Sequence, residues 1–363
     1  MSSELALREA LQSVLDPLTG KDFVSTQQLK WSFPSPDKVA LSLTLGYPAR
    51  SQWPALVDAL EAAVRAVAPN LIVSTHIETQ VVSHAVQRGV QLLPGIKNIV
   101  AVASGKGGVG KSTTAVNLAL ALAAEGAQVG LLDADIYGPS QPWMMGLSGQ
   151  RPESSDGQTM DPLENYGVQV MSIGFLVDAD NPMIWRGPMA TQALDQLLRQ
   201  TRWRELDYLI VDMPPGTGDI QLTLSQRVPL TGAVIVTTPQ DIALLDAKKG
   251  LKMFEKVSVP ILGVVENMAV HTCPQCGHTS HIFGEQGGQK MAAQYGVEYL
   301  GGLPLALSIR EQADSGKPTV VSEPEGEIAG MYRAIARRMA AKIALGAKDY
   351  SSKFPTITIS KNT

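Results

Sequence analysis

The sequence has no long apolar run and no excess of positive charge, and it contains only two cysteines. No apolar stretch reaches the roughly 18 residues that a membrane-spanning helix needs. The N-terminus has no basic segment followed by an apolar one, so no signal peptide is predicted. With 30 basic and 34 acidic residues, the net charge of −4 gives no electrostatic case for a nucleic acid or an anionic membrane as partner. We therefore expect a soluble cytoplasmic protein.

Both cysteines, Cys273 and Cys276, stand in a C-x-x-C motif, with His278 and His281 just behind. In a reducing cytosol this spacing indicates a metal or redox site rather than a structural disulfide. A tetrahedral metal or an iron–sulfur cluster takes about four protein ligands, and one chain offers only two thiols. The motif therefore predicts half of a metal site.

Other interpretations of the C-x-x-C motif remain open. His278 and His281 could complete a Cys₂His₂ zinc site in one chain, although four ligands within nine residues would be strained around one ion. Two copies of the motif could share a zinc ion between two chains. A thioredoxin-like redox role is disfavoured because the motif does not open a helix after the first strand.

The hydrophobic pattern of the first 90 residues differs from that of the rest. This segment predicts a small α+β domain with a hairpin. Its expected elements are a helix around Leu5–Leu15, strands within Val24–Phe33, Val39–Leu45 and Val73–Val81, and a helix over 51–67. We assign residues 91–97 to a linker.

Residues 98–345 show short continuous apolar runs that alternate with helical segments. Continuous runs are typical of strands that are buried on both faces of a parallel sheet. The expected strands are Ile99–Ala103, Val129–Leu132, Val168–Ile173, Tyr208–Val211, Ala233–Val236 and Ile261–Val265, and the expected helices are 112–125, 187–200, 241–256, 285–295 and 326–344. The fold class is thus α/β, a doubly wound and mostly parallel sheet. Residues 346–363 form a polar C-terminal tail.

Residues 105–112 read G-K-G-G-V-G-K-S and match the phosphate-binding motif G-x-x-x-x-G-K-[ST] between a predicted strand and a predicted helix. Glycines let successive backbone N–H groups turn toward phosphate oxygens, and the helix N-terminus adds its positive dipole. We expect Lys111 to contact the outer phosphates of ATP and Ser112 to bind Mg²⁺. The predicted nucleotide-binding residues of this loop are Gly105, Lys106, Gly107, Gly108, Val109, Gly110, Lys111, Ser112 and Thr113.

Carboxylates follow two of the predicted strands. Asp133 and Asp135 come after the strand over 129–132, and Asp212 comes after the strand over 208–211. Because open α/β sheets bind ligands at the carboxyl edge of their strands, we expect these side chains beside the phosphate loop. Asp212 is suited to hold Mg²⁺ through water, and Asp133 is expected to make a structural or Mg²⁺-water contact.

Lys106, directly after the first glycine, resembles the deviant P-loop of the MinD/ParA/nitrogenase-iron-protein class. With D-A-D-I-Y-G-P-S, D-M-P-P-G-T-G-D, E-N-M, and C-P-x-C-G followed by I-F-G, residues 98 to about 340 resemble the Mrp/ApbC/Nbp-type P-loop ATPases that carry iron–sulfur clusters. The first 90 residues resemble the small domain that is fused to bacterial members or stands alone in cluster assembly. Some stand-alone relatives have a functional cysteine there, and this segment has none.

The resemblance implies roles for individual residues. Lys106 would reach across a homodimer to the nucleotide of the partner, and Asp135 would orient or activate the attacking water. Gly216 would sense the γ-phosphate with its N–H, and Asn267 would hydrogen-bond the adenine base. The expected catalytic set is Lys106, Lys111, Asp135 and Asp212.

The resemblance also implies how the half-site at Cys273 and Cys276 is completed. In a C₂ dimer the two C-x-x-C motifs would meet and supply four thiolates, enough for a [4Fe–4S] cluster between the subunits. We expect a slow ATPase that receives a cluster from an assembly scaffold and transfers it to apo iron–sulfur proteins. The segments after Asp135 and Asp212 would act as switches that transmit the nucleotide state.

Two alternative functions remain open. A MinD/ParA-type positioning ATPase would share the P-loop, but it would need an amphipathic membrane helix or a basic DNA-binding surface. A P-loop switch with a structural zinc site would place zinc, not a cluster, on the thiols.

Overall fold

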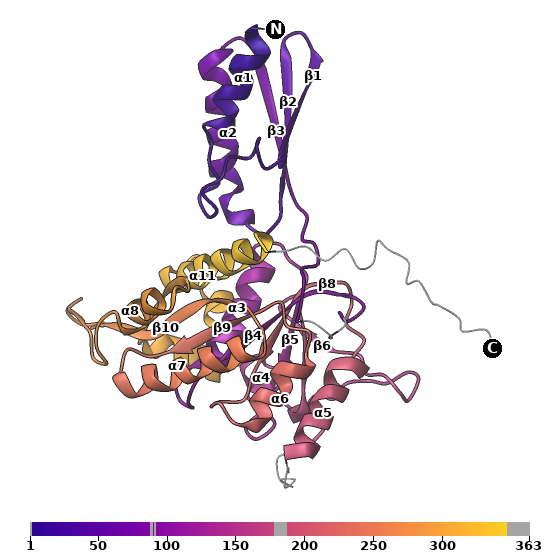
Figure 1. Cartoon of the computed structure of the whole chain (residues 1–363), viewed down its shortest axis with the longest axis vertical. Helices are drawn as coiled ribbons and strands as arrows, with labels where there is room; N and C mark the ends of the chain where they lie inside the picture. Colours follow the sequence, from indigo (N-terminus) through magenta and orange to yellow (C-terminus); the bar gives the residue numbers. More distant parts are fainter. Residues whose placement is uncertain (1, 88–89, 91, 178–186, 347–363) are drawn as a thin grey trace.

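The computed structural model describes residues 2–87, 90, 92–177 and 187–346. A smaller unit with the N-terminus stands on a larger α/β unit (Figure 1). The tail predicted over 346–363 lies outside the described residues, apart from Gly346. None of the helices in the described ranges is both long and apolar enough to cross a bilayer.

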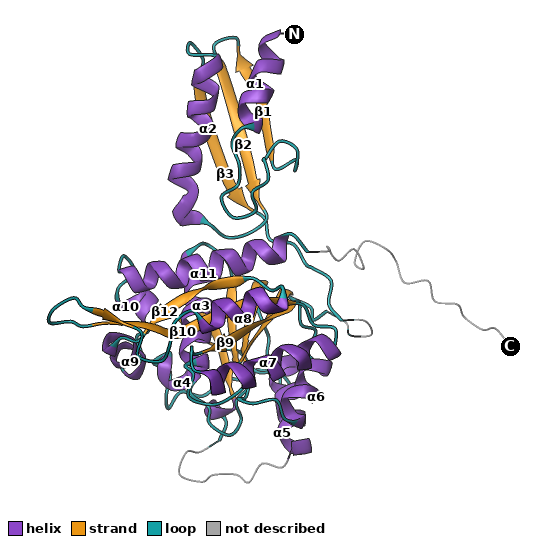
Figure 2. Ribbon diagram, turned by 60° about the vertical axis from the view of Figure 1, so that its left-hand side comes forward, coloured by secondary structure: helices purple, strands orange, loops and turns teal. Residues whose placement is uncertain are grey.

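The smaller unit is a three-stranded sheet with helices on one face (Figure 2). Its elements are α1 (Ser2–Gln12), β1 (Leu29–Ser35), β2 (Lys38–Leu45), the 3₁₀ helix η1 (Arg50–Gln52), α2 (Trp53–Val67) and β3 (Ile72–Thr79). Strands β1 and β2 form the expected antiparallel hairpin, and β3 pairs with β2 in parallel. Alternate side chains of β2 are buried, namely Val39, Leu41, Leu43 and Leu45.

The first strand begins later than predicted. The sequence suggested Val24 as its start, whereas β1 begins at Leu29. Residues 23–27 form a turn instead, in which the Ser25 N–H donates to Asp22 Oδ1 at 2.6 Å. An aspartate side chain that caps a nearby backbone N–H competes with strand pairing, which explains the later start.

The larger unit is a mostly parallel sheet with the strand order β11-β10-β9-β4-β8-β5-β7-β6, in which β12 also pairs with β10. Its strands are β4 (Ile96–Ala103), β5 (Val129–Asp133), β6 (Leu163–Asn165), β7 (Val168–Ser172), β8 (Leu206–Asp212), β9 (Gly232–Thr237), β10 (Ile261–Thr272), β11 (Thr279–Ser280) and β12 (Tyr299–Pro304). The pairings of β6 with β7 and of β11 with β10 are antiparallel, and the others in this sheet are parallel. The predicted doubly wound α/β architecture is confirmed.

Helices cover both faces of this sheet. They are α3 (Lys111–Ala124), α4 (Gln141–Met144), η2 (Ile173–Phe175), α5 (Gly187–Gln200), α6 (Asp219–Arg227), α7 (Asp241–Lys256), α8 (Gly287–Tyr295), α9 (Leu307–Asp314), α10 (Thr319–Ser322) and α11 (Glu327–Ala344). Helices α3 and α11 pack together on one face, and α5, α6 and α7 lie on the other (Figure 1). The five helices predicted for this unit are confirmed to within two residues at each end.

Five strands of the larger unit differ from the prediction, of which the short strands β6 and β11 were not predicted. Strand β4 begins at Ile96, inside the stretch assigned to the linker. Strand β10 continues to Thr272 instead of ending near Asn267. Strand β12 was missed because Gly301, Gly302 and Pro304 are unfavourable in strands.

The two units meet at the C-terminal end of α3. The Glu125 side chain is fully buried there, and its carboxylate accepts hydrogen bonds from the Ser51 N–H at 2.9 Å and the Ser51 hydroxyl at 2.6 Å. The guanidinium of Arg337, on α11, forms an ion pair with the same carboxylate at 2.6 Å. Helix α3 therefore extends from the phosphate loop at one end to the smaller unit at the other.

Replacement of Glu125 by alanine is expected to lower the free energy of unfolding by about 3 kcal/mol, because it leaves partly buried partners without their carboxylate. Urea denaturation measures the loss. Glu255→Ala is the matched control: Glu255 pairs with Lys252 at the surface, where the expected loss is below about 0.5 kcal/mol. Equal losses in both variants would contradict a structural role for the junction.

Candidate nucleotide site and cysteine turn

The loop between β4 and α3 needs its glycines for backbone geometry and close packing. Gly108 and Gly110 have φ angles of +81° and +80°, in the region that favours glycine. A Cβ on Gly110 would overlap the Asn267 side-chain amide, and one on Gly105 would overlap the backbone of Asp246 in α7. The loop therefore packs directly against β10 and α7.

Gly110→Ala is expected to cost about 2 kcal/mol of folding free energy, because alanine would be strained at positive φ and would displace Asn267. Gly107→Ala is the control, since a Cβ at Gly107 has no atom within 4 Å. Denaturation without nucleotide compares the two variants. If Gly107→Ala lost as much stability as Gly110→Ala, the packing argument would be wrong.

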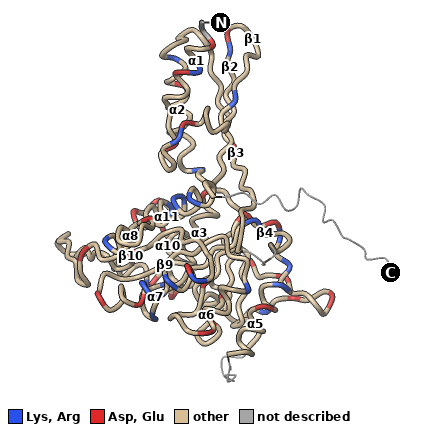
Figure 3. The backbone as a smooth tube through the Cα atoms, viewed as in Figure 1, with Lys and Arg blue, Asp and Glu red and all other residues tan. Residues whose placement is uncertain are grey.

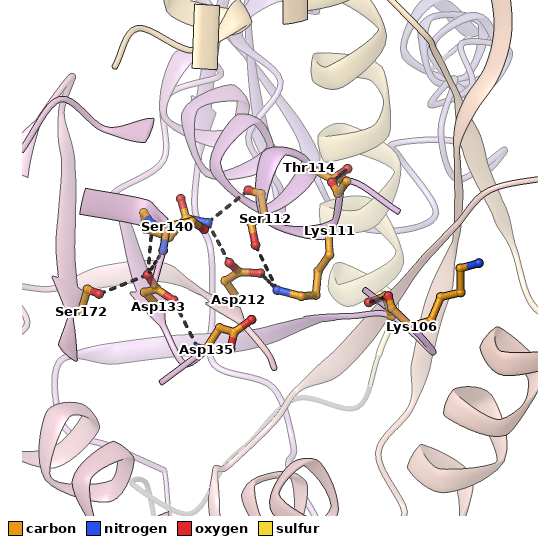
Figure 4. A network of polar contacts seen from close by, with 12 residues as sticks. Lys106, Lys111, Ser112, Thr114, Asp133, Asp135, Ser140, Ser172 and Asp212 are labelled. Atoms are coloured by element: carbon orange, nitrogen blue, oxygen red, sulfur yellow. Dashed lines mark hydrogen bonds and ion pairs between the residues drawn. The ribbon is translucent and has the colours of Figure 1, made fainter. Parts of the chain in front are cut away.

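Lys111 and Asp212 form a buried ion pair at the start of α3. Lys111 Nζ lies 2.5 Å from Asp212 Oδ1 and donates to Ser112 Oγ at 3.1 Å (Figure 4). The second Asp212 oxygen accepts from Gln141 Nε2 at 2.8 Å. The fold thus joins the loop lysine, the adjacent hydroxyl and the predicted Mg²⁺ carboxylate in one cluster.

Asp133, at the end of β5, is fully buried and bound by hydrogen-bond donors. Its Oδ2 accepts from the N–H groups of Ser140 and Gln141 at 2.9 and 3.0 Å and from the Ser172 hydroxyl at 3.1 Å. Burial, followed by the charge of nearby Asp212, raises the pKa of Asp133 to about 7. Asp133 therefore anchors the segment that follows Asp135.

Three more predicted residues lie on or near the phosphate loop. Asp135 lies beside Lys111 and Asp212 in Figure 4, and its pKa is raised, mainly by burial. The Gly216 N–H donates to the Ser104 carbonyl at 3.0 Å and so contacts the loop directly. The Lys106 side chain points away from the cluster (Figure 4).

Asn267 lies within β10 rather than at its end. Its side chain is buried, and Nδ2 donates to the Val109 carbonyl at 2.9 Å. The sequence predicted a contact with adenine but not this contact with the phosphate loop. The expectation that the strand ends here was wrong, because the chain passes through Met268 at a φ of +56° and continues to Thr272.

Gln141 is a site residue that the sequence did not reveal. Besides Asp212, its Nε2 binds the Ser112 carbonyl at 3.1 Å, so it joins the segment after Asp135 to α3. Thr113 follows Ser112 in the first turn of α3, and its carbonyl accepts from Asn117. In the sequence, the one indication of this role was that Gln141 is a polar residue in the G-P-S-Q-P stretch that follows Asp135.

Cys273 and Cys276 lie on the turn between β10 and β11, which projects from the larger unit (Figure 2). The Cys273 N–H donates to the His278 carbonyl and the Gly277 N–H donates to the Cys273 carbonyl, both at 2.9 Å. Both thiols are free, with Cys273 partly exposed and Cys276 exposed. Backbone N–H groups of Cys276 and Gln275 lower the pKa of Cys273, which favours its thiolate.

The two histidines of this region do not assemble a metal site with the thiols. His281 Nδ1 lies 3.0 Å from the Ala269 carbonyl oxygen. Across the described ranges, no three His, Cys, Asp or Glu side chains are grouped so that they could hold a metal ion. The Cys₂His₂ arrangement considered for a single chain is therefore absent from the described residues.

Two protein families match separate parts of this chain. Residues 95–340 match the family described as NUBPL iron-transfer P-loop NTPase. This chain belongs to that family. Residues 4–74 match a second family, described as iron-sulfur cluster assembly protein. The resemblance that was predicted from the sequence motifs is confirmed.

Individual proteins of other organisms are similar over most of this chain. An iron-sulfur cluster carrier protein of Pseudomonas fragi is 62% identical over 261 residues, which cover 72% of this chain and 91% of the relative. A protein of the same name from Haemophilus influenzae is 49% identical over 337 residues, covering 93% of this chain and 91% of the relative. The likeness to the second relative thus includes the smaller unit.

Solved structures show the P-loop NTPase fold. A nucleotide-binding protein from Archaeoglobus fulgidus, in complex with ADP, is 38% identical with a TM-score of 0.56, and the match covers 64% of this chain and 90% of that chain. The cell division ATPase MinD of Pyrococcus furiosus is 22% identical with a TM-score of 0.51, over 67% and 98% of the two chains. The second likeness concerns the fold alone.

Proposed function

We propose that this chain is an ATP-hydrolysing carrier that holds a [4Fe–4S] cluster between two copies of itself and transfers it to apo iron–sulfur proteins. The observation that carries the proposal is the position of the two thiols. They lie on a projecting turn at the end of β10, the same strand that contacts the phosphate loop through Asn267. One strand thus links a nucleotide site to half of a cluster site.

The buried cluster at the start of α3 fits ATP with Mg²⁺. Outer phosphates would draw the Lys111 ammonium away from Asp212, and the Gly216 N–H would exchange the Ser104 carbonyl for a phosphate oxygen. Ser112 and Asp212 offer the hard oxygen ligands that Mg²⁺ prefers. When bound, Mg²⁺ neutralises charge that develops on the phosphates. Asp135 would orient the attacking water.

A second copy of the chain would complete both sites. The Lys106 side chain points away from Lys111 and Asp212 (Figure 4), as that of a residue that serves the partner's nucleotide would. On α7, which packs against Gly105, Ile242 and Leu245 are 68% and 57% exposed, and Ile282, just beyond the cysteine turn, is 56% exposed. Apolar side chains that border both sites favour a face that a second copy covers.

The distribution of charge does not favour the DNA-positioning alternative. Figure 3 shows Lys and Arg interspersed with Asp and Glu along the described chain. A DNA-binding surface would instead gather basic residues on one face. We therefore retain the proposal of a cluster carrier, which receives its cluster from an assembly scaffold and passes it to apo iron–sulfur proteins.

Cluster transfer to apo-aconitase tests the carrier function. The chain is loaded with iron and sulfide without oxygen, desalted, and mixed with apo-aconitase in the presence of an iron chelator. Recovery of aconitase activity despite the chelator is expected, because a cluster that passes directly never becomes free iron. Recovery that the chelator abolishes would overturn the proposal.

A further inference from the structure

Strand β10 is attached to the phosphate loop through Asn267. Asn267 Nδ2 donates to the Val109 carbonyl, and the same amide packs so closely on Gly110 that a Cβ there would overlap it. Both contacts are buried within the larger unit. A movement of the loop at Val109 and Gly110 therefore has to move Asn267 or break its hydrogen bond.

The strand is kinked directly after Asn267. Met268 has a φ of +56°, which L residues rarely adopt, and the pairing of β10 with β12 shifts register between Glu266 and Val270. On one side of the kink, Glu266 accepts a hydrogen bond from the Gly288 N–H in the first turn of α8. On the other side, the Leu305 N–H donates to the Val270 carbonyl at 2.7 Å, and His271 Nδ1 lies 3.0 Å from the Leu305 carbonyl oxygen. A kink between two such attachments is a place where a small shift can be turned into a rotation.

Beyond the kink the strand leads into the cysteine turn without a flexible joint. His271 and Thr272 pair with Ser280 and Thr279 of β11, and His281 contacts the Ala269 carbonyl. Cys273 follows the last of these pairs. At about 3.3 Å per strand residue, the backbone between Asn267 and Cys273 spans at most roughly 20 Å. The two arms of the hairpin are thus expected to move as one body.

We propose that Asn267 is a positioning residue that couples the nucleotide state of the phosphate loop to the geometry of the turn carrying Cys273 and Cys276. Nucleotide binding shifts the Val109 carbonyl, and Asn267 moves with it. The backbone then rotates at the kink at Met268 and changes the orientation of the hairpin that carries the thiols. The inference rests on the proposed function, because it assumes that nucleotide binds the loop and that the thiols hold the cargo.

Thiol alkylation of the full, cluster-free chain tests the coupling. Cys273 and Cys276 are the only thiols in the sequence, so the rate of reaction with iodoacetamide reports on the turn alone. Asn267→Asp keeps the size of the side chain and removes its N–H donor. Asn165→Asp is the matched control, because Asn165 Nδ2 also donates to a backbone carbonyl, that of Met145 at 2.8 Å, far from β10 in the sequence.

In the wild type and in Asn165→Asp, saturating Mg-ATP is expected to change the alkylation rate by about fivefold or more. In Asn267→Asp, with binding of ATP verified by calorimetry, the change is expected to stay below about twofold. A full response in Asn267→Asp, or no response in the wild type, would overturn the coupling. If Asn267→Asp does not fold, Met268→Gly leaves Asn267 in place and makes the backbone between Asn267 and the hairpin more flexible, since glycine adopts more conformations. A full response in that variant would overturn the coupling equally.

The test separates the coupling from the carrier function. Alkylation uses no iron, so it gives an answer whether or not the thiols hold a cluster. Failure of the carrier function would show only in cluster loading and transfer. A chain that loads and transfers a cluster but alkylates at one rate with and without Mg-ATP would retain its proposed function and lose this inference.

Discussion

Replacement of Cys273 or Cys276 by serine is expected to remove the cluster from this carrier almost completely. In the proposed dimer each substitution occurs twice, so two of the four thiolates disappear, and a [4Fe–4S] cluster needs about four. After anaerobic reconstitution, iron is expected to fall from about four per dimer to well below one. Iron and sulfide analysis, together with the broad absorbance near ~400 nm, measures the loss.

His281→Ala is the control for this experiment, because the His281 ring contacts the Ala269 carbonyl and lies outside the proposed ligand set. Its iron content is expected to equal that of the wild type. A loss as large as that of the cysteine variants would show that the histidine is a ligand. Tightly held zinc in place of iron would instead favour the P-loop switch with a structural metal.

Lys111→Ala is expected to lower the rate of ATP hydrolysis at least about 100-fold, because it removes the ammonium that faces charge on the outer phosphates. A phosphate-release assay at saturating ATP measures the rate. Cluster loading is expected to remain at the wild-type level, since Lys111 lies in the nucleotide site and the thiols lie on the hairpin. Loss of hydrolysis without loss of cluster loading would show that the nucleotide site and the cysteine site act independently in loading.

The same substitution leaves Asp212 buried without its cation, so folding has to be tested independently. The double variant Lys111→Ala, Asp212→Asn removes both charges and is expected to recover stability but not hydrolysis. Lys97→Ala is the matched control, because Lys97 pairs with Asp207 near the surface at 2.7 Å. Hydrolysis by Lys111→Ala at the wild-type rate would contradict the proposed nucleotide site.

The sequence predicted those parts of the molecule that a short stretch of consecutive residues is enough to identify. The phosphate loop is eight consecutive residues, and continuous or periodic hydrophobicity indicates the buried strands and the long helices. Strand β12 was missed because its two glycines and its proline conceal a strand that is held by pairing with β10. Its stability comes from a neighbour distant in the sequence, which local propensity cannot reveal.

The polar contacts that link the parts were also beyond prediction. Gln141 joins residues 29 and 71 positions away, and the carboxylate of Glu125 joins residues 74 and 212 positions away. Neither residue stands out from other polar residues in the sequence, because its partners become neighbours only in the folded chain. The same holds for Asn267, whose contact with Val109 spans 158 positions and underlies the proposed coupling.

A mixed dimer tests the central claim, a cluster shared between two chains, most directly. A wild-type subunit and a subunit with both Cys273→Ser and Cys276→Ser carry different affinity tags, and the dimer that holds both tags is purified and reconstituted without oxygen. A bridging site predicts almost no bound iron, because only two thiolates remain. Half of the iron of the wild-type dimer would contradict the account, since each chain would then hold its metal alone.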